Sequence, residues 1–99
     1  MFVILSFTLV PVNAGVSLSP FVAACQKILK ESGLNYQLHA NGTNVEGEWD
    51  VVFKTIKRCH KKVHQMGADR IFTTIQLGTR TDKSQKMIDK EKSVMDILI

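Results

Sequence analysis

The chain has 99 residues, 44% of them hydrophobic, and this length and composition fit one small domain with a modest core. The formal net charge of +4 is spread along the chain rather than gathered in one run, so it is only a weak indication of an anionic ligand. Cys25 and Cys59 do not form a CxxC pair, which argues against a metal or redox motif. Both fall in amphipathic helical patterns, so we expect reduced, half-buried thiols and a cytoplasmic protein.

Residues 2–10 predict a central strand covered on both faces, because β-branched and aromatic residues fill the segment. One face is fully apolar and consists of Val3, Leu5, Phe7 and Leu9. The other face is apolar at its ends and carries the hydroxyl groups of Ser6 and Thr8 in its middle. The first lysine is Lys27, so no positive residue precedes the apolar segment, and we expect neither a secretory signal nor a membrane-spanning helix.

A helix is predicted to follow a loop at residues 11–18. Ser19 and Pro20 are typical of an N-cap followed by proline at the first helical position. Gly33 is expected to end the helix in the left-handed conformation. The apolar residues of this segment recur at helical spacing: Phe21, Ala24, Cys25, Ile28 and Leu29.

The middle of the chain predicts a hairpin and a second helix. Residues 34–40 alternate between apolar and polar, Asn41-Gly42 is a strong two-residue turn signal, and a short polar strand returns over residues 43–48. The second helix begins near Trp49 and ends before Gly67. Its apolar residues lie three and four positions apart: Trp49, Val52, Phe53, Ile56, Cys59, Val63 and Met66.

Two further elements are predicted at the end of the chain. Residues 70–77 favour a strand patterned like the first one, with Thr74 on its second face, and residues 87–98 favour a terminal helix. The order of elements predicts an α+β fold in which residues 1–99 form one ferredoxin-like domain. This βαββαβ sandwich has a four-stranded antiparallel sheet with two helices on one face, plus the C-terminal helix.

The second face of the predicted sheet is left uncovered by the two helices, and its composition is mixed. Its apolar residues are Phe2, Ile4, Val10 and Phe72, and its polar ones are Ser6, Thr8, Thr74 and Gln76. This face is too apolar for an isolated wet surface and too polar for a plain core, so we expect it to bury itself in a dimer or tetramer. A small-ligand pocket at that interface would use the hydroxyls of Ser6, Thr8 and Thr74, although threonine is also simply a good strand former.

Four stretches of the chain resemble the small, YkoF-related thiamine-binding protein family: residues 17–23, 31–36, 42–50 and 66–71. The most specific is Gly-Thr-x-x-Glu-Gly-Glu-Trp-Asp at residues 42–50. The resemblance covers nearly the whole chain and implies a ferredoxin-like fold, sheets that associate into dimers or tetramers, a cytosolic setting, and binding of thiamine or a related aminopyrimidine or thiazole without catalysis. The resemblance implies that ligand-binding positions of the family's motifs correspond to Thr43, Glu46, Trp49 and the loop from Arg80 to Asp82.

The chain departs from the pattern of this family in two places. His39-Ala40-Asn41 stands where Thr-Pro-Met is expected, and an acidic residue is expected near Gly78-Thr79. A second hypothesis is therefore an oligomeric structural or regulatory interaction module that has lost the ligand.

Thiamine combines a cationic thiazolium, a flat aminopyrimidine and a hydroxyethyl tail, so its receptor needs aromatic faces, a carboxylate and hydroxyl or amide groups. Trp49 would stack on a ring, or else anchor the second helix to the sheet. Glu46 would accept from the amine or offset the cation, or else be a solvated strand residue or part of an interface ion pair. Arg80 and Asp82 would close a pocket or bind a phosphate tail, or else form an ordinary exposed ion pair.

Other functional classes have weaker support. His60 and His64 are one helical turn apart, but the basic residues around them oppose a cation, so we expect no metal site. The strands lack the aromatic pair with which RNA-binding domains of this fold stack bases, which argues against nucleic acid. No spacing aligns a nucleophile with a base and an orienting group, and no glycine-rich phosphate loop is present, so we expect neither an enzyme nor a resident cofactor.

Overall fold

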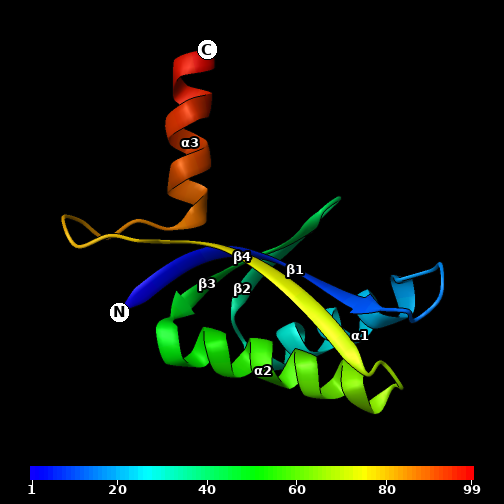
Figure 1. The fold of residues 1–99 in the computed structure, drawn as a ribbon. Helices are drawn as coiled ribbons and strands as arrows, with labels where there is room; N and C mark the ends of the chain where they lie inside the picture. The colour runs from blue at the N-terminus through cyan, green and yellow to red at the C-terminus, as the bar shows by residue number, and fades with distance from the viewer.

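The computed structural model describes all 99 residues, and its elements follow the order expected from the sequence (Figure 1). The chain forms β1 (Phe2–Val12), α1 (Ser19–Ser32), β2 (Asn35–His39), β3 (Gly42–Glu48), α2 (Trp49–Gln65), β4 (Arg70–Thr79) and α3 (Met87–Leu98). The strands lie in the order β2-β3-β1-β4, and all neighbours are antiparallel. The predicted α+β fold of ferredoxin-like type is confirmed.

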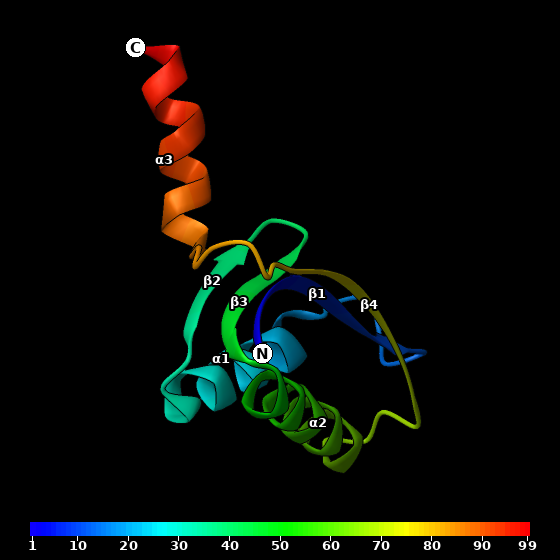
Figure 2. The same cartoon turned by 90° about the vertical axis from the view of Figure 1, so that its left-hand side faces the viewer.

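The core lies between one face of the sheet and the helices α1 and α2 (Figure 2). Leu5 of β1 pairs with Val45 of β3, and both side chains are almost completely buried. Because residues two apart share a face, a shift of one residue would expose this whole apolar row, so burial fixes the register. The buried hydrophobic residues are Val3, Leu5, Phe7, Leu9, Cys25, Ile28, Leu29, Val45, Val52, Ile56, Cys59, Val63 and Ala68.

The start of α1 differs from the prediction, and its end agrees with it. The N-cap is Leu18 rather than Ser19, and no side chain caps the helix. The N–H groups of Phe21 and Val22 donate to the carbonyl of Leu18 at 3.0 and 3.1 Å, and the proline in the first turn has no N–H that needs a partner. Gly33 ends the helix with a φ of 75°, as predicted.

β1 is longer than predicted, because Pro11 and Val12 continue the strand instead of beginning a loop. They pair with Ile71 and Arg70 of β4. The pairing with β3 stops earlier, at Phe7. The last part of β1 therefore has a neighbouring strand on one side only, a position in which proline is tolerated.

α3 stands on the sheet face opposite α1 and α2 and projects away from the rest of the domain (Figures 1 and 2). None of its residues is buried. Its exposed large apolar side chains are Ile88, Val94, Met95, Ile97 and Leu98. On the open sheet face, Phe72 is 62% exposed and Phe2 is 36% exposed. None of the three helices is both long enough and apolar enough to cross a bilayer.

The core assignment is tested by Leu5→Ala. Leu5 is 2% exposed, so we expect truncation to lower the free energy of unfolding by about 2–5 kcal/mol. The control is Leu38→Ala, because Leu38 is 54% exposed and should lose no more than about 0.5 kcal/mol. Chemical denaturation at one fixed protein concentration measures both values, and equal losses would contradict the assigned core.

Candidate ligand-binding site

The tip of the β2–β3 hairpin bends out of the sheet and is fastened to the open face of β1. The hydroxyl of Thr8 donates to the carbonyl of Asn41 at 2.6 Å, and the Ser6 hydroxyl lies 3.1 Å from Nε2 of His39. The N–H of Asn41 donates to Nδ1 of His39 at 3.2 Å, so in the neutral ring Nε2 carries the proton and donates to Ser6. The hydroxyls of Ser6 and Thr8 thus have partners within the chain, which the sequence did not indicate.

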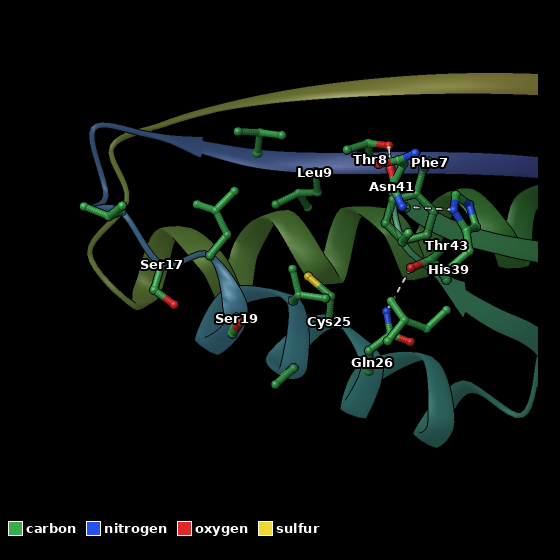
Figure 3. A pocket seen from close by; sticks show the side chains of 18 residues that line it. Phe7, Thr8, Leu9, Ser17, Ser19, Cys25, Gln26, His39, Asn41 and Thr43 are labelled. Atoms are coloured by element: carbon green, nitrogen blue, oxygen red, sulfur yellow. Dashed lines mark hydrogen bonds between the residues drawn. The ribbon is translucent and has the colours of Figure 1, made fainter.

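The bend of the hairpin leaves a cavity of about 1030 Å³ between β1, α1 and the hairpin tip (Figure 3). Its walls are mainly apolar, and no aspartate, glutamate, lysine or arginine lines it. Phe7 and Leu9 of β1 point toward α1 along its inner wall (Figure 3). The polar residues that line it are Thr8, Ser17, Ser19, Gln26, His39, Asn41 and Thr43.

Thr43 is buried at the inner end of this cavity and is oriented by α1. The side-chain amide of Gln26 donates to the Thr43 hydroxyl at 2.9 Å. The Thr43 hydroxyl keeps its own proton to donate, and Gln26 keeps its amide oxygen as an acceptor. The inner end of the cavity thus presents both a donor and an acceptor on otherwise apolar walls.

Cys25 also lines the cavity, and Cys59 lies behind it in the core. Both thiols are free, in agreement with the prediction of reduced cysteines, but they are almost completely buried rather than half-buried. The hydrogen bond with Cys25, together with burial, raises the pKa of the Cys59 thiol far above its ordinary value. Cys59 therefore stays protonated and unreactive at neutral pH.

Glu46 is 5% exposed, although it lies on the open face of the sheet. Its Oε1 accepts from the side-chain amide of Asn35 at 2.8 Å, and its Oε2 accepts from the backbone N–H of Met87 at 2.7 Å. Met87 is the first residue of α3, so the carboxylate stabilises the positive N-terminal end of that helix. Glu46 is therefore neither a solvated strand residue nor a member of an ion pair in this chain.

Arg80 and Asp82 form an exposed ion pair in the loop between β4 and α3, which was one of the two alternatives predicted for these residues. Two nitrogens of the guanidinium donate to the carboxylate, and Nη1 donates to the amide oxygen of Gln85 at 2.8 Å. The hydrogen bond from Arg80 lowers the pKa of the exposed Asp82 carboxyl to about 2. Arg80 also borders a smaller cavity of about 380 Å³ beside the open face, together with Lys83 and Lys90.

The remaining predicted site residues lie apart from these groups. Trp49 starts α2 and stacks on Phe53, with ring centroids 4.7 Å apart, and it lines neither of the two cavities. Thr74 is exposed on β4, where it pairs with Thr8 across the open face. Of the eight predicted residues, the structure brings only Thr8 and Thr43 to the large cavity.

The histidines of α2 are occupied by hydrogen bonds to the protein. Nε2 of His60 lies 2.6 Å from the hydroxyl of Thr73, and Nδ1 of His64 lies 2.7 Å from the carbonyl of Ala68. Burial, with a smaller contribution from His64, lowers the pKa of His60 and so favours its neutral form. His60 thus bonds to β4, whereas His64 bonds to the turn between α2 and β4.

Sequence reasoning missed Gln26, His39 and Asn41 as lining residues of the large cavity. Gln26 lies in an amphipathic helix and gives no signal of its own. His39 and Asn41 did carry a signal, because they belong to the hairpin segment in which the chain departs from the family pattern.

The role of Glu46 is tested by Glu46→Gln. The neutral amide loses the charge-assisted bond to the start of α3, so we expect the free energy of opening of α3 to fall by about 1–2 kcal/mol and hydrogen exchange at residues 87–90 to become faster. Glu48→Gln is the matched control, because the Glu48 carboxylate is 64% exposed and bonds only to the N-terminal amine. Hydrogen exchange measured by mass spectrometry should be faster in α3 of Glu46→Gln but not of Glu48→Gln. Unchanged exchange of α3 in both variants would show that Glu46 does not stabilise this helix.

Relatives with similar sequences and structures are found across distant organisms. The chain is 52% identical over 94 residues to a UPF0045 protein of Synechocystis sp., which covers 95% of this chain and 78% of that protein. It is 42% identical over 84 residues to a UPF0045 protein of Eremothecium gossypii, which covers 81% and 80%. The hypothetical protein MJ1052 of Methanocaldococcus jannaschii matches with a TM-score of 0.88 at 26% identity, over 96% of this chain and 97% of that one.

A Thermotoga maritima protein with a proposed role in thiamine biosynthesis or salvage shares the fold, with a TM-score of 0.81 at 18% identity over 95% of this chain and 99% of that one. A sequence profile described as thiamine-binding protein matches residues 5–95. That match includes most of β1, the other three strands and both core helices, and it covers the hairpin and the β1 residues that border the large cavity. The chain belongs to the thiamine-binding protein family.

Proposed function

We propose that this protein binds thiamine or a related aminopyrimidine or thiazole without transforming it, and that the large cavity holds the ligand. The observation that carries the proposal is a cavity of about 1030 Å³ with apolar walls and few polar groups, in a chain of the thiamine-binding family. Small-molecule sites are typically concave, mostly apolar and furnished with a few polar groups that set orientation.

The charge of the cavity favours a particular orientation of such a ligand. Its lining has no carboxylate, so the neutral aminopyrimidine suits the interior and the cationic thiazolium suits the mouth. Glu46 would offset the cation only by exchanging its bond to Asn35 or Met87 for one to the ligand. A preference for phosphorylated thiamine would instead follow Arg80 and the lysines of the smaller cavity.

Binding without catalysis is supported by how the reactive side chains of the cavity are used. Both ring nitrogens of His39 are bonded, one to Ser6 and the other to the N–H of Asn41. The ring is therefore not paired with Cys25, the thiol in the cavity lining.

The proposal is tested by calorimetric titration with thiamine, thiamine monophosphate and thiamine diphosphate. We expect saturable binding of at least one of them with one ligand per chain, and thermal stabilisation in the same sample. At a ligand concentration of 100 times Kd the stabilisation is about 2.7 kcal/mol. An absence of both heat and stabilisation with all three compounds would overturn the proposal and favour the interaction module.

A second function, self-association into a dimer or tetramer, is favoured by the open face of the sheet. Phe72, Phe2 and Val10 are exposed there, and α3 stands beside them with an apolar side that nothing in the chain covers. Thr8 and Val10 belong both to this face and to the lining of the large cavity. A second chain on the open face would therefore border the ligand, which connects the association to an interface pocket.

Self-association is tested by Ile4→Asp, which puts a charge on the open face. We expect the variant to have the mass of a single chain by light scattering, because an unpaired charge in an apolar interface is strongly unfavourable. The control is Val51→Asp on α2, a 45% exposed residue on the helical side of the domain. An unchanged mass for Ile4→Asp, or equal loss of association in both variants, would contradict the interface.

A further inference from the structure

The direction of the backbone groups of β1 follows from one hydrogen bond at its start. The carbonyl of Met1 accepts from the N–H of Trp49 at 2.8 Å, on the side where β3 lies. Backbone groups of alternate residues in a strand point to the same side, so the odd-numbered residues of β1 face β3 and the even-numbered ones face β4. Phe7 is the last of these odd-numbered residues with a partner, because its pairing with Thr43 ends the β1–β3 ladder.

Two odd-numbered residues of β1 lie beyond that point. Leu9 and Pro11 pair with β4 residues in the register, but by alternation their backbone groups point the other way, to the side that β3 has left. Pro11 fits this orientation, since proline inside a strand needs its nitrogen on an unpaired side. The edge therefore offers one donor, the N–H of Leu9, and two acceptors, the carbonyls of Leu9 and Pro11.

The hairpin does not occupy these groups. Its tip is fastened to the side chains of Ser6 and Thr8 on the open face, and the Asn41 carbonyl is used by the Thr8 hydroxyl. No backbone bond outside the regular ladders and helices involves Leu9 or Pro11. Leu9 lines the large cavity, and Figure 3 shows it between β1 and α1 with the hairpin residues to one side. Leu9 is only 9% exposed, and buried backbone groups are almost always paired, so this edge is a place for a ligand to bond.

We propose that the unpaired edge of β1 at Leu9 recognises the aminopyrimidine edge of the ligand, an assignment that rests on the proposed function. The exocyclic amine donates to a carbonyl of the edge, and the ring nitrogen beside it accepts from the N–H of Leu9. The heterocycle thereby takes the place of the strand residue that β3 does not provide. Its flat faces lie against the apolar walls of the cavity.

The same edge is poorly suited to a peptide. Pro11 lacks the donor that would follow the N–H of Leu9 along this edge, and only residues 8–12 lie between the hairpin tip and the end of β1. β-strand addition depends on a continuous row of backbone bonds. A ligand that needs one donor and one acceptor fits the available length.

The assignment predicts selectivity for the amine. In oxythiamine a carbonyl replaces the amine and the neighbouring ring nitrogen carries a proton, so the donor and acceptor are exchanged. Sites built to bond a particular donor reject an analogue that lacks it strongly, because protein groups are left unpaired. We expect oxythiamine to bind at least tenfold more weakly than thiamine.

The experiment is a titration of leucine-selective ¹⁵N-labelled protein with thiamine, the free aminopyrimidine half and oxythiamine, followed by NMR. We expect thiamine and the aminopyrimidine to shift the Leu9 amide signal and to slow its hydrogen exchange at least tenfold. Leu5, which faces the same side but is paired with Val45, is the internal control and should change little.

Ala23→Phe, which fills the cavity, should weaken thiamine binding at least tenfold, whereas Lys30→Phe elsewhere on α1 should not.

The outcomes separate the two proposals. Thiamine binding with an unaffected Leu9 amide, or with equal affinity for oxythiamine, would overturn the strand-edge assignment and leave the proposed function standing. No binding of thiamine or of its aminopyrimidine half would overturn both.

Discussion

The difference in length between two neighbouring strands underlies the features that point to function in this domain. β1 has 11 residues and β3 has 7, and their ladder ends at Phe7 and Thr43. The far end of β1 keeps β4 as its neighbour but has no strand on the side where β3 has ended, and α1 borders it on the helical side of the sheet. The hairpin tip turns to the open face instead of continuing along β1, and the large cavity is the space that remains.

Glu46 provides the second constraint, on the opposite side of the sheet. A buried carboxylate is costly unless hydrogen bonds compensate it, and here Asn35 and the first N–H of α3 do so. The contact joins residues 41 positions apart and fixes the start of α3 beside β3. The most specific motif of the sequence therefore contributes two different groups: Thr43 lies in the large cavity, whereas Glu46 supports the projecting helix.

Much of the fold could be predicted from the sequence because it depends on local patterns. The alternation of Val3, Leu5 and Phe7 and the left-handed Gly33 each depend on a few neighbouring residues, and both agree with the structure. The hairpin lies where its Asn-Gly signal predicts it, but the two-residue loop is Ala40-Asn41 rather than Asn41-Gly42, because Gly42 already belongs to β3 and pairs with His39. The site was less accessible to such reasoning. The bend of the hairpin depends on contacts between residues 33 positions apart, and the Glu46 contact depends on a loop with no periodic signal. Ser6 and Thr8 were correctly placed on the open face, but their partners could only be identified once the hairpin was positioned.

The exposure of α3 has a consequence for the cooperativity of unfolding. Twelve residues are too few for a stable isolated helix in water, and α3 adds no buried residue to the core. Its opening therefore exposes little apolar surface and does not require the sheet to separate, so it forms a local unfolding unit of its own. Trp49, stacked on Phe53 at the start of α2, is the one tryptophan of the chain and reports on the helix that packs against the sheet. Circular dichroism also includes the residues of α3, so the two signals describe different transitions, and a single two-state free energy would describe only the transition of the sheet and its two core helices.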